Sequence, residues 1–409
     1  MEMHTDYHLY SSIEYLPSAS KRAVIDLGAL QHNWRALREF LSRDESPARP
    51  IAVIKADAYG HGAPQCARAL LDVGCDFFAV SCIEEAIALR SAIRDAKKDA
   101  DILILGHTPV SQAKKLAKEN LIQTLISPSY TEDLSLTARE QNLTLRTHIA
   151  LNTGMNRIGF GCATPDEIQK TLDAIEAIAR QGNLRIEGMF THFSTADGDT
   201  DADRALFRTQ IERYRSVKDA LALRGIRLPF HHVCNSAATA LSPELHFDGV
   251  RAGILLYGGV KYSSLPTLRP VMRLECDVVH VFSLTPGESV GYGAEYTAES
   301  ERKIAVLPIG YADGLMRAMK GSTVTVKTQT GICKVPLVGR ICMDQCMLDV
   351  TDTDVSVGDT ATLFGNDPEE LLTLSERAGT IPYEILCLIS SRVKRHYLDT
   401  EPAQNKDTL

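Results

Sequence analysis

The sequence predicts a (β/α)₈ barrel followed by a mostly-β domain. Short apolar, β-branched runs alternate with longer amphipathic stretches from Arg22 to about Gly259, which is typical of a parallel sheet covered by helices. The number of these units, about eight, is that of a (β/α)₈ barrel. After about Leu268 the helical pattern gives way to alternating runs punctuated by glycine, proline and aspartate. An open doubly wound sheet remains the alternative for the first part.

The elements of the first part are expected in strict β-then-α order. Strands are predicted at residues 50–55, 77–80, 101–105, 123–126, 143–150, 184–189, 230–234 and 249–251. Helical periodicity separates them, as at residues 27–41, 84–93, 164–180 and 202–223.

The second part is expected to be built almost entirely from strands, at residues 274–284, 303–308, 323–327, 334–338, 347–350 and 360–364. A helical pattern is predicted there only from Ser375 onward. The predicted domains are an N-terminal tail at 1–21, the barrel at 22–267, the β domain at 268–400 and a tail at 401–409.

Composition excludes several classes of function. The chain has 409 residues, a net charge of −8 and a pI of about 5.9, so it repels nucleic acid and anionic membrane surfaces. No apolar run approaches the ~18 residues that a membrane span needs. Ten cysteines spread over this length do not make a disulfide framework, and the N-terminal segment does not resemble a signal peptide, so we expect a cytoplasmic protein with reduced thiols.

Two segments resemble metal sites but fail the tests for them. Cys342 and Cys346 have no second Cys/His pair nearby, so zinc is not expected. The acidic stretch that begins at Asp197 lacks the glycine and glutamate of a calcium loop, since Ala202 and Arg208 occupy those positions. We interpret this stretch as a solvated loop that caps a helix, and we expect no metal.

Unusual polar residues follow four of the predicted barrel strands, where the active site of a barrel lies. The apolar run 51–54 ends in Lys55, and such a lysine loses hydration, which lowers its pKa and suits covalent bonding to a carbonyl group. His192, Ser236 and Arg251 follow three later strands. A lysine that extends to water at a strand end, or a structural histidine, is the alternative for each residue alone. Their convergence on one rim favours a functional site.

These residues belong to segments that resemble the motifs of alanine racemases, in order and at compatible spacings over about residues 22–398. The run 52–62, AVIKADAYGHG, is similar to the family's pyridoxal-phosphate lysine signature. The other matching segments are 152–159 (NTGMNRIG), 191–193 (THF), 235–237 (NSA), 291–293 (GYG), 310–314 (GYADG) and 339–345 (GRICMDQ).

The resemblance implies a pyridoxal 5′-phosphate enzyme in which Lys55 bonds to the cofactor. Tyr59 and Ser236, with the backbone amides of Gly253 and Ile254, would hold the phosphate. Arg251 would face the pyridine nitrogen, and because a guanidinium only donates hydrogen bonds, that nitrogen would stay unprotonated. We expect this to limit diversion of the reaction into transamination.

The resemblance further implies two bases on opposite faces of the substrate, since racemisation removes the α-proton from one face and returns it to the other. Lys55 would act on the D-substrate and Tyr292 on the L-substrate. A phenol is a poor base at neutral pH, and the family places His192 beside it, linked through Arg251 to His232.

In the family, the tyrosine at position 292 reaches the barrel of the other subunit, so the resemblance implies a head-to-tail homodimer. Arg157 and the Met343 amide would bind the substrate carboxylate. Asp344 belongs to the same motif as Met343, and Tyr311 would line the entrance.

The sequence departs from the family pattern at three positions. Ala150 replaces a lysine that is carbamylated in some members, and Asn152 replaces a usual aspartate, so the support of Arg157 must differ. Ser391 occupies the place of a tyrosine that touches the phosphate. Losing that ring enlarges the pocket, so we expect relaxed selectivity, with serine or other small amino acids accepted beside alanine.

Two other functions remain as alternatives. A related barrel-type pyridoxal-phosphate decarboxylase shares the cofactor lysine and a β domain, but it does not need Tyr292 between glycines or the segment around Met343. A non-catalytic pyridoxal-phosphate-binding protein is typically a barrel alone, and the long β domain argues against it.

Overall fold

The computed structural model describes residues 20–44 and 47–398, and the chain divides into two compact units. The barrel unit contains Ile25–Arg273 and Gly365–Ile389, together with residues 397–398. The β unit contains Leu274–Phe364 and Ser390–His396, together with residues 20–24. This division differs from the expected one, because residues 20–24 group with the β unit and residues 365–389 with the barrel.

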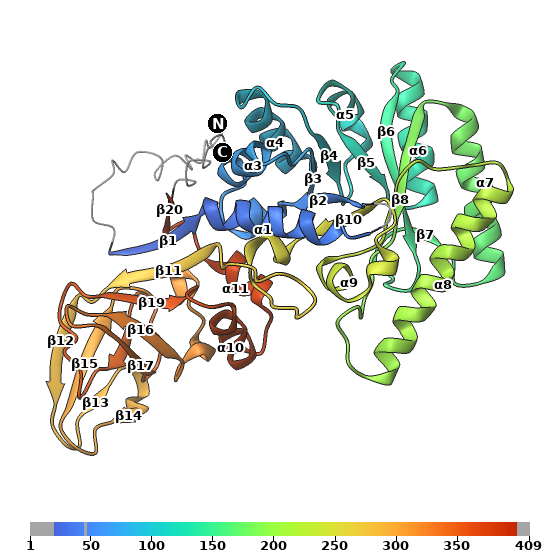
Figure 1. Cartoon of the computed structure of the whole chain (residues 1–409). Coiled ribbons are helices and arrows are strands. Elements are labelled where there is room, and N and C mark those ends of the chain that lie inside the picture. The colour runs from blue at the N-terminus through green and yellow to red at the C-terminus, as the bar shows by residue number, and fades with distance from the viewer. Residues whose placement is uncertain (1–19, 45–46, 399–409) are drawn as a thin grey trace, which may run out of the picture. The chain divides into compact units, whose positions relative to one another are not determined.

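The barrel unit is built on eight parallel strands in the order β10-β2-β3-β4-β5-β6-β8-β9, with helices outside them (Figure 1). The amide of Arg251 on β10 donates to the carbonyl of Cys234 after β9 at 3.0 Å, which brings the two ends of the path together. The predicted barrel is therefore confirmed, and the open sheet is not. The strands are β2 (Arg49–Val53), β3 (Phe77–Val80), β4 (Asp101–Ile104), β5 (Ile122–Leu125), β6 (Leu145–Asn152), β8 (Leu184–Phe190), β9 (His231–His232) and β10 (Gly249–Ala252), and β7 (Phe160–Gly161) pairs with β6.

Side chains that cap the helices explain where several of them begin. Asp26 accepts the amide of Ala29 at 2.7 Å, and Thr200 and Asp203 form a capping box. The acidic stretch near Asp201 thus leads into a helix, as expected. The helices of this unit are α1 (Leu27–Leu41), α2 (Lys55–Tyr59), α3 (Ala63–Asp72), α4 (Ile83–Asp95), α5 (Ala113–Lys118), α6 (Pro128–Glu140), α7 (Pro165–Gln181), α8 (Asp201–Leu223), α9 (Ser236–Leu241), α10 (Pro368–Ala378) and α11 (Pro382–Leu388), with 3₁₀ turns η1 (Val110–Gln112), η2 (Pro243–Leu245) and η3 (Ile254–Tyr257).

Ion pairs lie near the amino ends of the barrel strands. Arg146 on β6 contacts Asp101 at 2.8 Å and Glu187 at 2.7 Å, and Arg49 on β2 contacts Asp76 at 3.0 Å and Asp101 at 3.2 Å. Asp101 at the start of β4 thus links β2 and β6, each separated from β4 by one strand in the sheet order, while the pairs with Asp76 and Glu187 link adjacent segments. The ion pairs at this end of the barrel therefore hold its strands together.

The β unit contains a nine-stranded sheet in the order β12-β15-β18-β17-β16-β19-β11-β1-β20. The N-terminal strand β1 lies between β11 and β20, and Arg22 on β1 pairs with Glu275 at 2.9 Å and Asp277 at 3.1 Å. The strands are β1 (Lys21–Asp26), β11 (Met272–Asp277), β12 (His280–Leu284), β15 (Arg302–Leu307), β16 (Thr323–Lys327), β17 (Ile332–Val338), β18 (Cys346–Asp349), β19 (Thr360–Phe364) and β20 (Lys394–Leu398), with the small pair β13 (Ser289–Val290) and β14 (Tyr296–Thr297) and the turns η4 (Tyr292–Ala294), η5 (Tyr311–Asp313) and η6 (Arg317–Met319).

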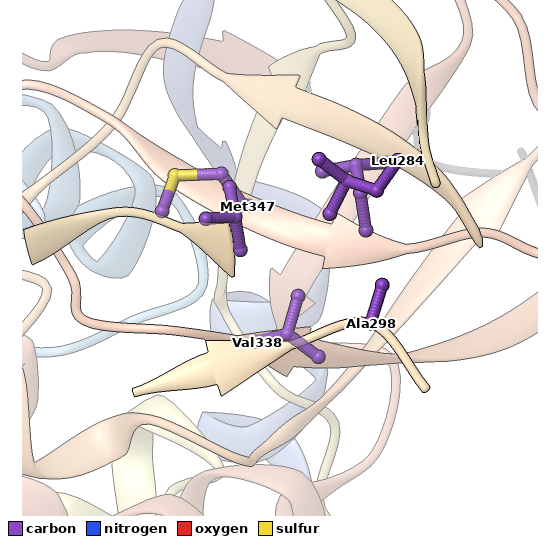
Figure 2. Packing of buried hydrophobic residues seen from close by; sticks show 6 residues of the cluster. Leu284, Ala298, Val338 and Met347 are labelled. Carbon is purple, nitrogen blue, oxygen red and sulfur yellow. The ribbon is translucent and has the colours of Figure 1, made fainter. Parts of the chain in front are cut away.

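A hydrophobic cluster supports one face of this unit. Leu284, Ala298, Val338 and Met347, from segments far apart in the chain, point toward one another (Figure 2). Val290 belongs to the same cluster. Because Val290 immediately precedes the Gly291–Gly293 segment, the cluster anchors the turn that carries Tyr292.

Two element predictions for the second part are wrong. The run 274–284 is not one strand, since β11 ends at Asp277 and β12 begins at His280. A helix begins well before Ser375, because Asp367 caps α10 and Pro368 occupies its first turn.

Candidate active site

A cavity of ≈ 370 Å³ opens at the carboxyl ends of the barrel strands. Its lining comes from the segments that follow β2, β3, β4, β6, β8, β9 and β10, so the barrel closes around it. Seven predicted site residues lie at this cavity: Lys55, Tyr59, Arg157, His192, Ser236, Arg251 and Gly253. Ile254 follows Gly253 and is fully buried.

Lys55 enters the cavity at the start of an unusual turn. Residues 56–59, none of them glycine, have φ between 51° and 55°, in the left-handed region. Such a conformation costs about 1–2 kcal/mol per residue, so it persists only where surrounding contacts enforce it. The carboxylate of Glu85, on α4, accepts the amide of Ala56 at 2.8 Å, and the ring of His61 lies 2.8 Å from the carbonyl of Ala58.

Burial lowers the pKa of Lys55 below its ordinary value, and the guanidinium of Arg157 lowers it further. Cys387 and Glu85 oppose this effect, and Arg251 adds to it. A lowered pKa increases the fraction of neutral amine at physiological pH, which is the form that attacks a carbonyl carbon. The lysine therefore has the character expected of a covalent cofactor anchor.

Tyr59, Ser236 and Gly253 form a recess beside Lys55. The Gly253 amide donates to Ser236 Oγ at 3.0 Å, and a Cβ at Gly253 would lie 2.6 Å from the Tyr59 hydroxyl. The Tyr59 ring packs against Tyr257 at 4.9 Å and Tyr383 at 5.9 Å. Burial raises the pKa of the Tyr59 phenol, so it remains a hydroxyl donor. Hydroxyl and amide donors around a position that admits no side chain suit a phosphate group.

Arg251 lies fully buried at the centre of a hydrogen-bonded chain. Its guanidinium donates to the carbonyls of His232 at 2.6 Å and Thr191 at 2.8 Å. It also lies 3.1 Å from Nδ1 of His232 and 3.2 Å from Nδ1 of His192. His232 continues the chain, with its Nε2 2.9 Å from Nδ1 of His148.

The arginine determines the tautomers of these histidines. Because a guanidinium only donates, Nδ1 of His192 and of His232 must accept, which assigns their protons to Nε2. Burial lowers the pKa of His192 to about 3, with Arg251 adding to the effect, and burial likewise lowers the pKa of His148 to about 3. The rings are therefore neutral at physiological pH, while Arg251 stays charged although burial lowers its pKa to about 10.

Arg157 lies in the loop after β6, and within the described residues it makes no ion pair. The loop itself is firmly held. Asn152 accepts the amide of Asn156 at 2.9 Å, and Thr153 bonds Thr191 at 2.7 Å through their hydroxyls. Buried Gln210, on α8, donates to Thr153 Oγ1 at 3.1 Å.

Gln210 joins this loop to the neighbouring one. The same amide group donates to the His192 carbonyl at 3.0 Å and accepts the Ser194 amide at 2.9 Å. Neighbouring Arg213 donates to the Thr153 carbonyl at 2.9 Å. The loops of Arg157 and His192 therefore have a shared support in Gln210.

Four predicted residues lie in the β unit instead. Tyr292, Met343 and Tyr311 are 70%, 52% and 43% exposed, on turns. The Tyr311 turn and the Met343 turn are neighbours, since the amide of Ala312 donates to the Met343 carbonyl at 3.0 Å. Asp344 pairs with Arg392 at 2.6 Å.

Glycines shape the turn that presents Tyr292. Gly291 and Gly293 have φ of 79° and 75°, and a Cβ at Gly293 would lie 3.0 Å from the guanidinium carbon of Arg340. Arg340 in turn pairs with Glu295 at 2.7 Å. The turn thus holds the Tyr292 ring outward, into solvent in the single chain.

Several residues at the site were missed from the sequence. His148 lies inside the run predicted as a strand, where residues 147–151 are all buried, and a histidine in the middle of such a run was the available signal. Gln210 and Glu85 lie on amphipathic helices, where a polar residue ordinarily faces water. Tyr383 lines the cavity from α11, within the helical pattern predicted from Ser375 onward, but it was not predicted to reach the site.

In the described part of the chain, no group of three or more His, Cys, Asp or Glu residues could hold a metal ion. None of the described helices is long and apolar enough to cross a bilayer.

Fold and site together define a parallel-barrel protein with a lysine of lowered pKa in a cavity at the carboxyl rim. The profile for "Alanine racemase, N-terminal domain" matches residues 25–261, and that for "Alanine racemase, C-terminal domain" matches residues 271–397. "Alanine racemase 1" of Clostridium acetobutylicum is 40% identical, over 92% of this chain and 95% of that protein.

Solved structures agree with these matches. Alanine racemase from Streptomyces coelicolor A3(2) has a TM-score of 0.83 at 34% identity, covering 93% of this chain and 98% of that one. The Clostridium difficile 630 alanine racemase has a TM-score of 0.81 at 34% identity, covering 94% and 97%. The chain belongs to the alanine racemase family and is an isomerase.

Proposed function

We propose that this chain interconverts L- and D-alanine with pyridoxal 5′-phosphate bound at the barrel cavity. The observation that carries the proposal is Lys55, an amine of lowered pKa beside a recess of hydroxyl and amide donors. The relatives named as alanine racemases support the reaction and substrate.

The residues at the cavity fit the cofactor. Lys55 would bond to it, and Tyr59 and Ser236, with the backbone of Gly253 and Ile254, would hold its phosphate. A side chain at position 253 would fill the space beside the Tyr59 hydroxyl, so the glycine keeps the recess open. Pyridoxal phosphate, when bound, stabilises the electron pair that remains on the substrate α-carbon after proton loss.

Arg251 would face the pyridine nitrogen as a donor. Its guanidinium keeps its proton at neutral pH, because burial lowers its pKa only to about 10, and carbonyls and histidine nitrogens hold the group in place. The consequence is a weaker electron sink than a carboxylate partner would give, which favours returning the proton to the α-carbon over transamination.

Two groups would move the α-proton, one on each face. Lys55 is the base for the D-substrate, and Tyr292 of a second copy of the chain is the base for the L-substrate. His192 supports the phenol, since its Nδ1 accepts from Arg251 and its Nε2 proton remains available to donate. Arg157 and the Met343 amide would bind the substrate carboxylate, with Asp344 in the same turn and Tyr311 at the entrance.

The enzyme would act as a head-to-tail homodimer. Tyr292, Tyr311 and Met343 are large exposed side chains on turns of the β unit, and burying them in an interface would remove their apolar surface from water. A cytoplasmic location is part of the proposal, on the ground of the dispersed cysteines, all ten of which are free.

Ser391 would widen the range of substrates. The family resemblance implies a tyrosine at this place, and a serine in its stead would leave room for a side chain larger than methyl. We expect serine to be racemised beside alanine, and Ser391→Tyr to reduce serine turnover at least about tenfold relative to alanine. Equal serine turnover by both forms, or strict specificity for alanine in the wild type, would contradict this substrate proposal.

The central experiment follows proton exchange and chirality together. L- and D-alanine are incubated in ²H₂O with the holoenzyme, and α-deuterium and enantiomer ratio are measured. We expect racemisation with exchange in the wild type, and in Tyr292→Phe a loss of racemisation of at least about a hundredfold from either enantiomer. Exchange without inversion should persist better with D-alanine, whose α-proton Lys55 removes and can return to the same face. Carbon dioxide release instead would indicate the decarboxylase, and cofactor binding without exchange would indicate a non-catalytic protein.

A further inference from the structure

Glu85 holds two barrel strands at the site with one carboxylate. It lies in the first turn of α4, after β3. One oxygen accepts the amide of Ala56, the residue after Lys55, at 2.8 Å, and the other accepts the amide of Ser81 at 2.7 Å. Both Lys55 and Ser81 line the cavity. The carboxylate therefore bridges the carboxyl ends of β2 and β3 next to the reactive lysine.

The bridge is needed because the backbone leaves the sheet at this point. The amide of Ile54 still donates to the carbonyl of Ala79 in the parallel ladder, at 2.9 Å. From Ala56 onward the chain is left-handed, so the amide of Ala56 has no strand partner in the ladder. Glu85 supplies a charged acceptor in its place, and hydrogen bonds to a charged group are about twice as strong as neutral ones.

We propose that Glu85 is a positioning residue that fixes the backbone from which Lys55 enters the cavity. The left-handed turn is unfavourable by itself and has nearby alternatives in φ and ψ, each of which would move the Lys55 Cα and its amine. A carboxylate that accepts hydrogen bonds from backbone amides following both β2 and β3 excludes those alternative backbone conformations. The inference rests on the proposed function for its catalytic consequence, but not for its structural one.

Charge gives Glu85 a second effect on the same amine. The charged and titratable groups that act on Lys55 are Arg157, Arg251 and His192 from the strand ends, Cys387 from α11, and Glu85 from α4. Burial, Arg157 and Arg251 lower the pKa of Lys55, whereas Glu85 raises it. Loss of the Glu85 charge therefore lowers the pKa of Lys55 further.

Glu84 provides a matched control. It lies in the same first turn of α4 and carries the same charge, but it is exposed and its side chain forms a hydrogen bond with Cys82 instead of with the Lys55 turn. Glu84→Gln removes the same charge from the same helix terminus. Any difference between E85Q and E84Q thus reports the bridge and the proximity to Lys55, not the helix dipole.

The test compares wild type, E85Q, E85D and E84Q, first without cofactor. In E85Q one oxygen can still accept a hydrogen bond, but the NH₂ group faces the other of the two backbone amides, of Ala56 and Ser81. In E85D the charge remains, but the side chain is one methylene shorter. Hydrogen exchange of the peptide containing Ala56 is expected to be about tenfold or more faster in E85Q and E85D than in E84Q. Labelling of the Lys55 amine against pH is expected to show a lower pKa in E85Q only.

The second arm measures racemisation with cofactor bound. We expect kcat to fall about tenfold to a hundredfold in E85Q and E85D with little change in KM, and E84Q to match the wild type. Exchange, labelling and kcat in E85Q equal to those in E84Q would overturn the inference. A wild type without racemase activity would overturn the proposed function instead, while exchange and labelling would still decide the role of Glu85. E85D decides the bridge if E85Q does not fold.

Discussion

Arg251 can influence the cofactor because its guanidinium donates hydrogen bonds and cannot accept one. All of its recorded partners are acceptors: backbone carbonyls and Nδ1 atoms of histidines. We predict that Arg251→Glu increases conversion of alanine to pyruvate, because a carboxylic acid partner strengthens the electron sink. Pyruvate formed per racemisation event is the measurement.

Arg251→Lys is the control for this prediction, since it retains a positive charge at the same place. Thermal unfolding of both variants is needed as well, because glutamate would leave buried carbonyls without their donor. A folded Arg251→Glu enzyme with an unchanged ratio of pyruvate formation to racemisation would contradict the role of the arginine.

His148 makes the free energy of unfolding depend on pH. Burial lowers its pKa to about 3 from an ordinary value of 6.5, so the folded state binds fewer protons than the unfolded state between these values. The stability gained from the neutral ring is fully present above pH 6.5 and is lost as the pH falls below it. The loss is at most about 1.4 kcal/mol per pH unit for this residue.

His148→Gln is therefore expected to lose stability less steeply than the wild type on acidification from pH 7 to pH 5, measured by urea unfolding. Exposed His280 provides a control, and His280→Gln should keep the wild-type slope. His192 and His232 add to the slope in the same direction, so the variant should retain part of it. An unchanged slope in His148→Gln would contradict the prediction.

At the scale of elements, the turn between β10 and η3 determines the shape of the phosphate recess. We predict that Gly253→Ala weakens pyridoxal phosphate binding about tenfold, because the new Cβ would lie 2.6 Å from the Tyr59 hydroxyl. Gly331→Ala, at a glycine with no neighbour within 4 Å, should bind normally. Cofactor titration by absorbance measures both variants, and equal affinities would show that the recess tolerates a methyl group.

Elements with strong local signals were predicted well. The helix at residues 27–41 and the strand at 77–80 have the observed bounds, because amphipathic periodicity and a fully buried run leave little ambiguity. The strand β1 was missed because its partners, β11 and β20, are hundreds of residues away. The break between Asp277 and His280 was missed because the two valines between them continue the β-branched, apolar composition of the run.

The candidate site shows the same limit. Lys55, His192 and Ser236 could be found because each follows a strand, and Arg251 because it lies near the end of one. A barrel brings strand ends together. Glu85 and Gln210 could not, because a helix pattern does not reveal which polar residue turns toward a backbone amide. Their roles depend on hydrogen bonds between segments that only the folded chain brings into contact.

At the scale of the whole molecule, the separation of Lys55 and Tyr292 into different units makes subunit exchange a test of the dimer. Lys55→Ala and Tyr292→Phe are each expected to be nearly inactive. If Tyr292 serves the neighbouring subunit, mixed dimers contain one complete site, and random exchange should restore about a quarter of wild-type activity. Alanine racemisation after mild dissociation and reassociation measures the recovery.

Folded, dimeric variants that regain nothing on mixing would contradict a shared site. Full activity of a wild-type monomer, measured by dilution with light scattering, would contradict it as well.

The position of β1 constrains how this protein can be divided. Lys21 and Arg22 begin β1, which pairs on one side with β11 and on the other with β20, both much later in the sequence. Lys21 also pairs with buried Asp313 at 2.7 Å. A fragment that starts near residue 268 would lack β1, and the edges of β11 and β20 that pair with it would be left open. The buried carboxylate of Asp313 would also lose its ion pair with Lys21. A C-terminal fragment that folds on its own therefore has to carry the β1 sequence as an added segment.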